Sequence, residues 1–189
     1  MEKAQFRLAL LGLFALCWPA ASPLPNGAPL GSCLSMSPKH RGITPQTGES
    51  PHSIQLQVSR SSVQVNIMGP TYKGILLEAR YPSGNTTVGM WATAPANTKT
   101  ISCFNSDHSA ITHSNTNDKS STTVYTWNPP PLKNCSEKTF VFLATVAQNR
   151  GTYWLKLTSN EISLCSSAVK NLSGFAVLAT FMIAGLAAF

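Results

Sequence analysis

Few residues of this 189-residue sequence have the types and spacing that catalysis or metal binding requires. The four histidines, at positions 40, 52, 108 and 113, share no helical face with one another or with a carboxylate at metal-ligand spacing. No Gly-x-Ser-x-Gly motif or acidic partner accompanies His113, so Thr112–Ser114 is better interpreted as a turn than as part of a hydrolytic triad. Phosphate loops, dinucleotide fingerprints and zinc knuckles are absent. We therefore expect no enzyme activity, no catalytic or metal-binding residue and no cofactor.

Cysteine is the residue type whose chemistry the sequence does predict. Besides Cys17, which lies in an apolar N-terminal run, there are four: Cys33, Cys103, Cys135 and Cys165. An even number in an exported chain indicates two disulfides, which can be connected in three ways. Residues 139–147 and 152–159 read as a hairpin, and extending its register brings position 135 opposite 164. We therefore expect Cys135 to pair with Cys165, and Cys33 with Cys103.

The charged residues favour an anionic partner. Residues 22–166 contain eleven Lys and Arg against six Asp and Glu, a net charge of about +5 that attracts anions. The close groupings are Lys39 with Arg41 and Lys133 with Lys138, which are the candidate anion-binding residues. A merely solvated basic surface is the alternative interpretation. Nucleic acid is not expected, because the aromatic residues occupy strand positions instead of lying among these charges.

These side chains must be positioned by β-strands. Ile54, Leu56 and Val58 alternate with polar residues, and so do Val63, Val65 and Ile67, which is the period of half-buried strands. Further candidate strands are residues 72–81, 89–91, 123–127, 140–146 and 153–157. We predict an all-β fold, an antiparallel immunoglobulin-like sandwich of about 7–9 strands with two disulfides. The cysteine and tryptophan spacing does not suit an immunoglobulin domain proper.

Two polar segments, 105–122 and 128–134, are expected to be loops at the ends of the sandwich. Sequons place candidate N-glycans at Asn85 and Asn134, of which Asn85 is the better candidate because a cysteine follows Asn134. Aromatic residues at strand positions are expected to form the core, and the sequence indicates no pocket. They are Tyr72, Trp91, Trp127, Phe140, Phe142, Tyr153 and Trp154.

Both ends of the chain have the composition of export signals. Lys3 and Arg7 precede an apolar run of about eleven residues and then small residues, the order of a signal peptide, so residues 1–21 are expected to be removed. Residues 22–167 would form the mature domain. The run is shorter than the roughly twenty residues of a membrane-spanning helix.

The other end, residues 168–189, is apolar and has no Lys or Arg after its hydrophobic run. Small residues before a polar spacer indicate attachment of a glycosylphosphatidylinositol lipid, with Ser166 and Ser167 as candidate attachment residues. A short retained membrane helix is the alternative, and a soluble protein a further one. Localisation is therefore expected to be extracellular, on the outer face of the plasma membrane.

Several motifs, in this order along the chain, resemble a reeler domain, the module named for the N-terminus of reelin and also found in spondins. They are Gly27–Pro29 before Cys33, Met36–His40, Tyr72–Arg80, Thr112–Ser114, Val124–Pro129 and Tyr153–Trp154. Together they span nearly the whole mature chain. The resemblance implies a β-sandwich with two disulfides, which agrees with the alternation of polar and apolar residues.

The resemblance also implies a function. Ferric-chelate reductase-like members of the family continue into a haem-binding membrane bundle, and this sequence has no such histidine-bearing helices. The chain is most similar to stand-alone reeler proteins described as defence proteins of innate immunity. We therefore expect a non-catalytic binding protein whose partner is an anionic microbial surface component. The alternative is an adhesion or matrix-type module, or an accessory ectodomain without a redox centre, that binds an extracellular protein or glycan.

Overall fold

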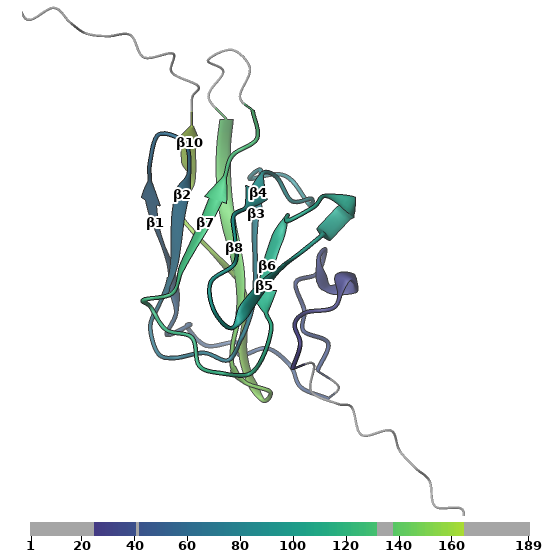
Figure 1. Cartoon of the computed structure of the whole chain (residues 1–189). Helices are drawn as coiled ribbons and strands as arrows, with labels where there is room; N and C mark the ends of the chain where they lie inside the picture. The colour runs from purple at the N-terminus through teal and green to yellow at the C-terminus, as the bar shows by residue number, and fades with distance from the viewer. Residues whose placement is uncertain (1–24, 41, 132–137, 165–189) are drawn as a thin grey trace, which may run out of the picture.

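The computed structural model describes residues 25–40, 42–131 and 138–164, and these residues form an antiparallel β-sandwich (Figure 1). The strands are β1 Ser53–Val58, β2 Val63–Met68, β3 Gly74–Arg80, β4 Met90–Trp91, β5 Thr98–Ile101, β6 Ala110–His113, β7 Val124–Asn128, β8 Lys138–Asn149, β9 Thr152–Thr158 and β10 Ile162–Leu164. The only helical elements in the described part are two short 3-10 turns, η1 Leu30–Ser32 and η2 Cys103–Asn105. No described helix is long and apolar enough to cross a membrane.

The strands form two sheets. One contains four strands in the order β1-β2-β7-β4, and the other has the order β10-β8-β3-β6-β5, with β9 also paired to β8. All pairings are antiparallel. The predicted all-β sandwich is confirmed, with two very short strands, β4 and β10, bringing the described number to ten.

Alternating side chains of the two sheets meet in the core. Val63, Val65 and Ile67 of β2 are fully buried, whereas Gln64 between them is exposed, as the period of two requires. The indole ring of Trp127 packs edge-on against Phe140 and Phe142. The prediction that the aromatic residues form the core is confirmed for six of the seven, and Trp154 is half-buried.

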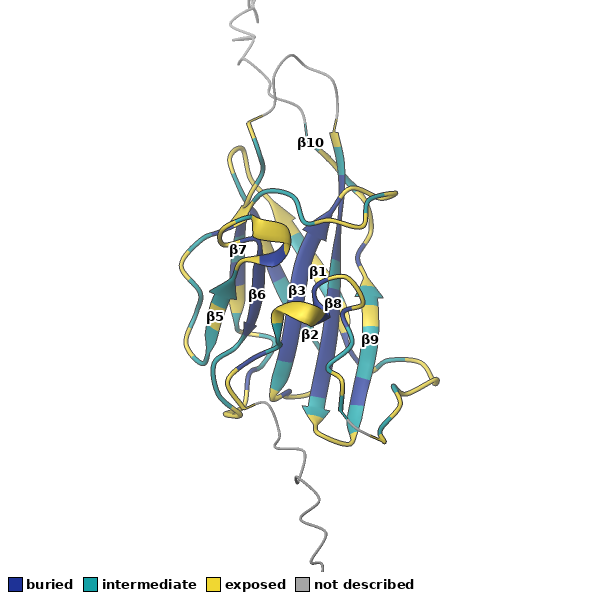
Figure 2. Ribbon diagram, turned by 90° about the vertical axis from the view of Figure 1, so that its right-hand side faces the viewer, coloured by how far each residue is buried: buried dark blue, intermediate teal, exposed yellow. Residues whose placement is uncertain are grey.

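The N-terminal arm, residues 25–40, covers part of the outer face of the six-stranded sheet. Figure 2 shows it in front of β3 and β8. A disulfide joins Cys33 of the arm to Cys103, the two cysteines that the sequence analysis paired. The hydroxyl of Thr145 in β8 donates a hydrogen bond to the carbonyl of Met36 at 2.8 Å. The arm therefore has a small buried cluster of its own, formed by Cys33, Met36, Leu76, Cys103 and Ala110.

The structure corrects the prediction that residues 105–122 form a loop. Strand β6 lies inside this segment and pairs with both β3 and β5. Strand β5 was not predicted at all. Short strands such as Ala110–His113 show too few alternations to be detected, and Thr112 is buried although it is polar, because its hydroxyl donates to the carbonyl of Ile75.

The structure also corrects the predicted register of the β8–β9 hairpin. Asn149 pairs with Thr152, so the connection between β8 and β9 is shorter than the segment 148–151 left between the two predicted strands. The two bulges within the hairpin shift the register in opposite senses and cancel, and one further residue enters between Thr158 and Ile162. Leu164 of β10 therefore lies opposite Lys138 instead of position 135. Cys135 and Cys165 lie outside the described residues, and their disulfide stays a prediction.

Candidate functional site: a pocket beneath the N-terminal arm

A pocket of about 290 Å³ lies between the arm and the sheet. Its walls come from the arm, from β3, from the end of β6 and from the β8–β9 hairpin. The lining residues are Gly27, Ala28, Pro29, Ser32, Met36, Pro38, His40, Lys73, Gly74, Ile75, Leu76, His113, Thr116, Thr145, Ala147, Asn149 and Arg150. Most of this lining is apolar, and it contains no Asp or Glu.

Small residues keep the pocket open. A β-carbon added to Gly74 would lie 3.2 Å from the β-carbon of Ala147 and 3.7 Å from Cε1 of His113, so even one methyl group there would be tightly packed. Gly27 has a φ of +108°, which favours glycine, and its added β-carbon would lie 2.7 Å from the carbonyl oxygen of His113. The arm can therefore approach β6 closely at Gly27, and the floor between Gly74 and Ala147 stays free of large side chains.

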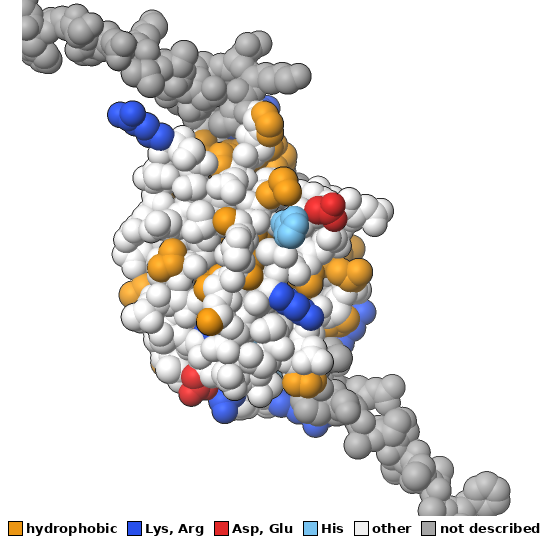
Figure 3. Space-filling view, viewed as in Figure 1, with side chains coloured by type: hydrophobic (Ala, Val, Ile, Leu, Met, Phe, Trp, Pro, Cys, Tyr) orange, Lys and Arg blue, Asp and Glu red, His pale blue; other side chains and the backbone are white. Residues whose placement is uncertain are grey.

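One end of the pocket is open and cationic. Lys73 and Arg150 are lining residues with exposed side chains. Lys39 belongs to the arm, and its Nζ lies 3.3 Å from a β-carbon added to Gly31. Lys99 of β5 lies alongside the arm, and its Cε lies 3.0 Å from a β-carbon added to Gly27. These four residues, Lys39, Lys73, Lys99 and Arg150, are called the cationic rim below. Figure 3 shows Lys and Arg side chains along the lower edge of the molecule, where acidic side chains are few.

The other end of the pocket is buried and contains a polar atom that has no partner. Met36 and Ser32 have no exposed surface, and Leu76 is 3% exposed. The Ser32 hydroxyl makes no hydrogen bond within the described part of the chain. Leaving such a group unsatisfied costs about 1–3 kcal/mol, and the oxygen is too buried for a water-sized molecule in the pocket to reach it.

Histidines contribute to the wall through their hydrogen bonds. His40 Nδ1 lies 2.8 Å from the carbonyl oxygen of Arg150, and the His40 ring packs edge-on against Tyr153, which fixes the end of the arm on the hairpin. His113 Nδ1 lies 3.3 Å from the backbone nitrogen of Ile75.

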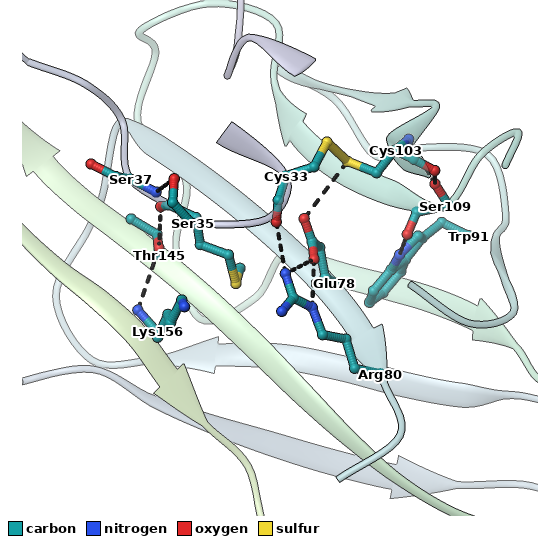
Figure 4. Close-up of polar contacts among 11 residues, drawn as sticks. Cys33, Ser35, Ser37, Glu78, Arg80, Trp91, Cys103, Ser109, Thr145 and Lys156 are labelled. Carbon is teal, nitrogen blue, oxygen red and sulfur yellow. Dashed lines mark hydrogen bonds and ion pairs between the residues drawn. A yellow bond between two sulfur atoms is a disulfide. The ribbon is translucent and has the colours of Figure 1, made fainter. Parts of the chain in front are cut away.

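A buried ion pair lies under the arm next to the disulfide (Figure 4). Arg80 donates to Oε2 of Glu78 through Nε at 2.9 Å and through Nη2 at 2.7 Å, and Nη2 also donates to the carbonyl of Cys33 at 2.7 Å. Burial raises the pKa of the Glu78 carboxyl, and the hydrogen bonds and charge of Arg80 partly offset this effect. The ion pair therefore fixes the backbone of the arm at Cys33.

Glu78 and the two cysteines also lie close enough together to hold a metal ion. The two sulfur atoms are bonded to each other, however, and a metal would need them as thiolates. In the oxidised protein this cluster is structural.

Comparison with known proteins assigns the chain to a family. The Reeler domain model matches residues 31–169, which is most of the chain. The chain belongs to the Reeler domain family. A protein of Antheraea mylitta named "Putative defense protein 3" is 33% identical over 153 residues, which cover 77% of this chain and 89% of that protein.

Other relatives carry the Reeler domain within longer chains. Ferric-chelate reductase 1 of Mus musculus is 30% identical over 172 residues, which cover 86% of this chain but 28% of the reductase. Among solved structures, the reeler domain of human F-spondin superposes with a TM-score of 0.50 at 17% identity, covering 66% of this chain and 96% of that one. This likeness shows the fold.

One residue of each predicted anion-binding grouping lies in the described part of this Reeler domain, so the groupings themselves stay predictions. Lys39 is exposed in the arm, near the hairpin end of β8, whereas Lys138 is exposed at the start of that twelve-residue strand. Arg41 and Lys133 lie outside the described residues. Asn85 is exposed on the turn after β3, and the other modification candidates, Asn134, Ser166 and Ser167, lie outside the described part of the chain.

Sequence reasoning missed the Reeler domain pocket and three members of its cationic rim. Lys73, Lys99 and Arg150 are far apart in the sequence, and they converge only because β5, β6, β3 and β8 are neighbours in the sheet. The one signal available was Gly74, at the start of a strand, where glycine often marks the close approach of another group.

Proposed function

We propose that this chain is a non-catalytic extracellular binding protein of innate defence that recognises anionic components of microbial surfaces. The observation that carries the proposal is that Lys73 and Arg150 of the cationic rim are exposed at a mainly apolar pocket whose lining contains no acidic residue. Such a mouth attracts anions and disfavours cations. The pocket supplies the concave, mainly apolar surface that is typical of ligand sites.

The comparison with known proteins supports the same function. The relative named as a defence protein matches this chain over most of both lengths, so the two have the same architecture along the matched part. The reductases match over about a quarter of their own length, and their redox activity belongs to whole proteins of which this chain is similar to one part. The match to them favours the second candidate function, an accessory ectodomain without its own redox centre.

Binding of envelope components tests the proposal. The protein, expressed as the full chain in secreting eukaryotic cells, is expected to bind immobilised lipopolysaccharide or lipoteichoic acid, and binding should weaken markedly from 20 to 150 mM salt because the rim is exposed and screened. A double Lys73→Gln/Arg150→Gln variant should weaken binding about tenfold or more. Arg60→Gln/Lys138→Gln also removes two exposed positive charges, both outside the pocket lining, and is the control. The proposal is wrong if the unmodified protein binds neither component at either salt concentration.

A further inference from the structure

The pocket has the two ends of a site for an amphiphile. At the mouth, Lys73, Asn149 and Arg150 are exposed, and two of them are cations. Inside, Met36 and Leu76 are buried and apolar. A sugar or nucleotide would need many polar partners along its length, which these walls do not supply. An apolar body with an anionic end fits both parts of the site.

The volume limits the size of this body. At about 30 Å³ for each water-sized group, the cavity of about 290 Å³ holds about ten non-hydrogen atoms. That is enough for one unbranched aliphatic chain of medium length. It is too small for two chains side by side.

The polar contacts of a bound molecule are expected at the mouth of the pocket. Lys73, Asn149 and Arg150 are exposed there. The Ser32 hydroxyl has no partner in the described part of the chain, but its oxygen is too buried for a water-sized group in the pocket to touch it.

We infer that the pocket binds a single aliphatic chain of about ten non-hydrogen atoms with an anionic group at the cationic rim. The inference builds on the proposed function, because it names the part of an anionic envelope component that enters the site. The chain can come from a free acid or from an acylated envelope lipid, and the experiment distinguishes the two sources.

The first measurement uses decanoate and the neutral 1-decanol, titrated calorimetrically into the full-chain protein at concentrations where neither aggregates. Decanoate is expected to bind at one-to-one stoichiometry. It should bind about tenfold more tightly than 1-decanol, because hydrogen bonds between charged groups are stronger than those of a neutral group. Absence of saturable binding by decanoate would overturn the inference.

Two variants test the mouth and the floor of the pocket. Lys73→Gln/Arg150→Gln should reduce the ratio of the two affinities to about one. The matched control, Arg60→Gln/Lys138→Gln, removes two exposed cations outside the lining and should keep the ratio. Ala147→Leu places a larger side chain in the lining and should weaken binding of both molecules more than tenfold. If this variant does not fold, Gly74→Ala is the milder replacement on the same floor. A preserved ratio in Lys73→Gln/Arg150→Gln would contradict the inference.

The last experiment compares binding of intact lipopolysaccharide with binding of the same material after removal of its acyl chains. If the chain-bearing form binds more tightly and Ala147→Leu abolishes the difference, the envelope lipid is the source of the chain. Equal binding of both forms, with decanoate still bound, would assign the chain to a free acid and leave the proposed function standing. Binding of the free acids without binding of any envelope component would support the pocket and refute the proposed function.

Discussion

At the scale of single residues, the ion pair beneath the arm illustrates how a buried charge is tolerated. The side chain of Glu78 has no exposed surface and that of Arg80 is 4% exposed. Burying either charge alone is unfavourable, and the pair persists because Arg80 satisfies both the carboxylate and the carbonyl of Cys33. The Arg80 guanidinium therefore compensates the negative charge of Glu78 and also positions the arm that forms the roof of the pocket.

Replacing Arg80 should therefore be severe. Arg80→Met leaves the Glu78 carboxylate buried without a counter-charge, and the free energy of unfolding should fall by about 3–5 kcal/mol in urea denaturation followed by tryptophan fluorescence. The double variant Glu78→Gln/Arg80→Met has no buried charge and should recover part of that loss. A single-variant loss below about 1 kcal/mol would show that the pair does not hold the arm.

At the scale of elements, the sequence predicts strands best where alternation is long and uninterrupted. Strands β1 and β2 have six residues each and were predicted from the positions of Ile54 and Val65 and their neighbours. Strand β6 was missed because its four residues contain too few alternations, and because Thr112 is a polar residue that is nevertheless buried. The predicted hairpin register was wrong because the pairing extends to Asn149 and Thr152, polar residues at the turn that the alternation of apolar residues did not include.

The pocket could not be predicted for a related reason. Its floor consists of two small residues, Gly74 and Ala147. A single sequence does not show that two small residues far apart in the chain lie next to each other and leave a cavity above them. Its roof depends on a disulfide between positions separated by 70 residues. The pairing of Cys33 with Cys103 was predicted by assigning Cys135 to Cys165 in the hairpin, but the space that the disulfide encloses was not predicted.

The disulfide should matter most for the arm. Cys33→Ala/Cys103→Ala removes a cross-link that closes a long loop, and the chain-entropy model assigns about 4 kcal/mol to a loop of this size. Hydrogen exchange should show loss of protection at Met36 and at the pocket wall before loss in β2 and β7, which lie in the other sheet. Uniform loss of protection across both sheets would mean that the arm and the sandwich unfold as one unit.

At the scale of the whole molecule, we expect a lipid anchor to hold the sandwich on the outer surface of a cell. The apolar residues 168–189 and the small residues before them favour a lipid anchor, and this part of the chain lies outside the described residues. A lipid-held binding domain would present its pocket to microbes at the cell boundary instead of diffusing away. That arrangement suits a protein that acts by binding.

The anchor is tested on intact cells. Treatment of expressing cells with phosphatidylinositol-specific phospholipase C should release most of the surface protein into the medium, because that enzyme cleaves the lipid from the protein. A chain truncated after Ser167 should appear in the medium without treatment. Protein that stays on the surface after treatment would favour a retained helix.

The loop that follows β6 has a built-in cation. The buried ammonium of Lys119 donates to the carbonyls of Lys73, Asn115 and Asn117 at 2.8 to 3.2 Å, and burial lowers its pKa to about 8, so it is mostly charged at neutral pH. Converging carbonyl oxygens are the ligands that calcium prefers. Here a side chain of the protein takes the position that a bound ion occupies elsewhere, and it joins the loop that supplies Thr116 to the pocket wall with Lys73 at the mouth.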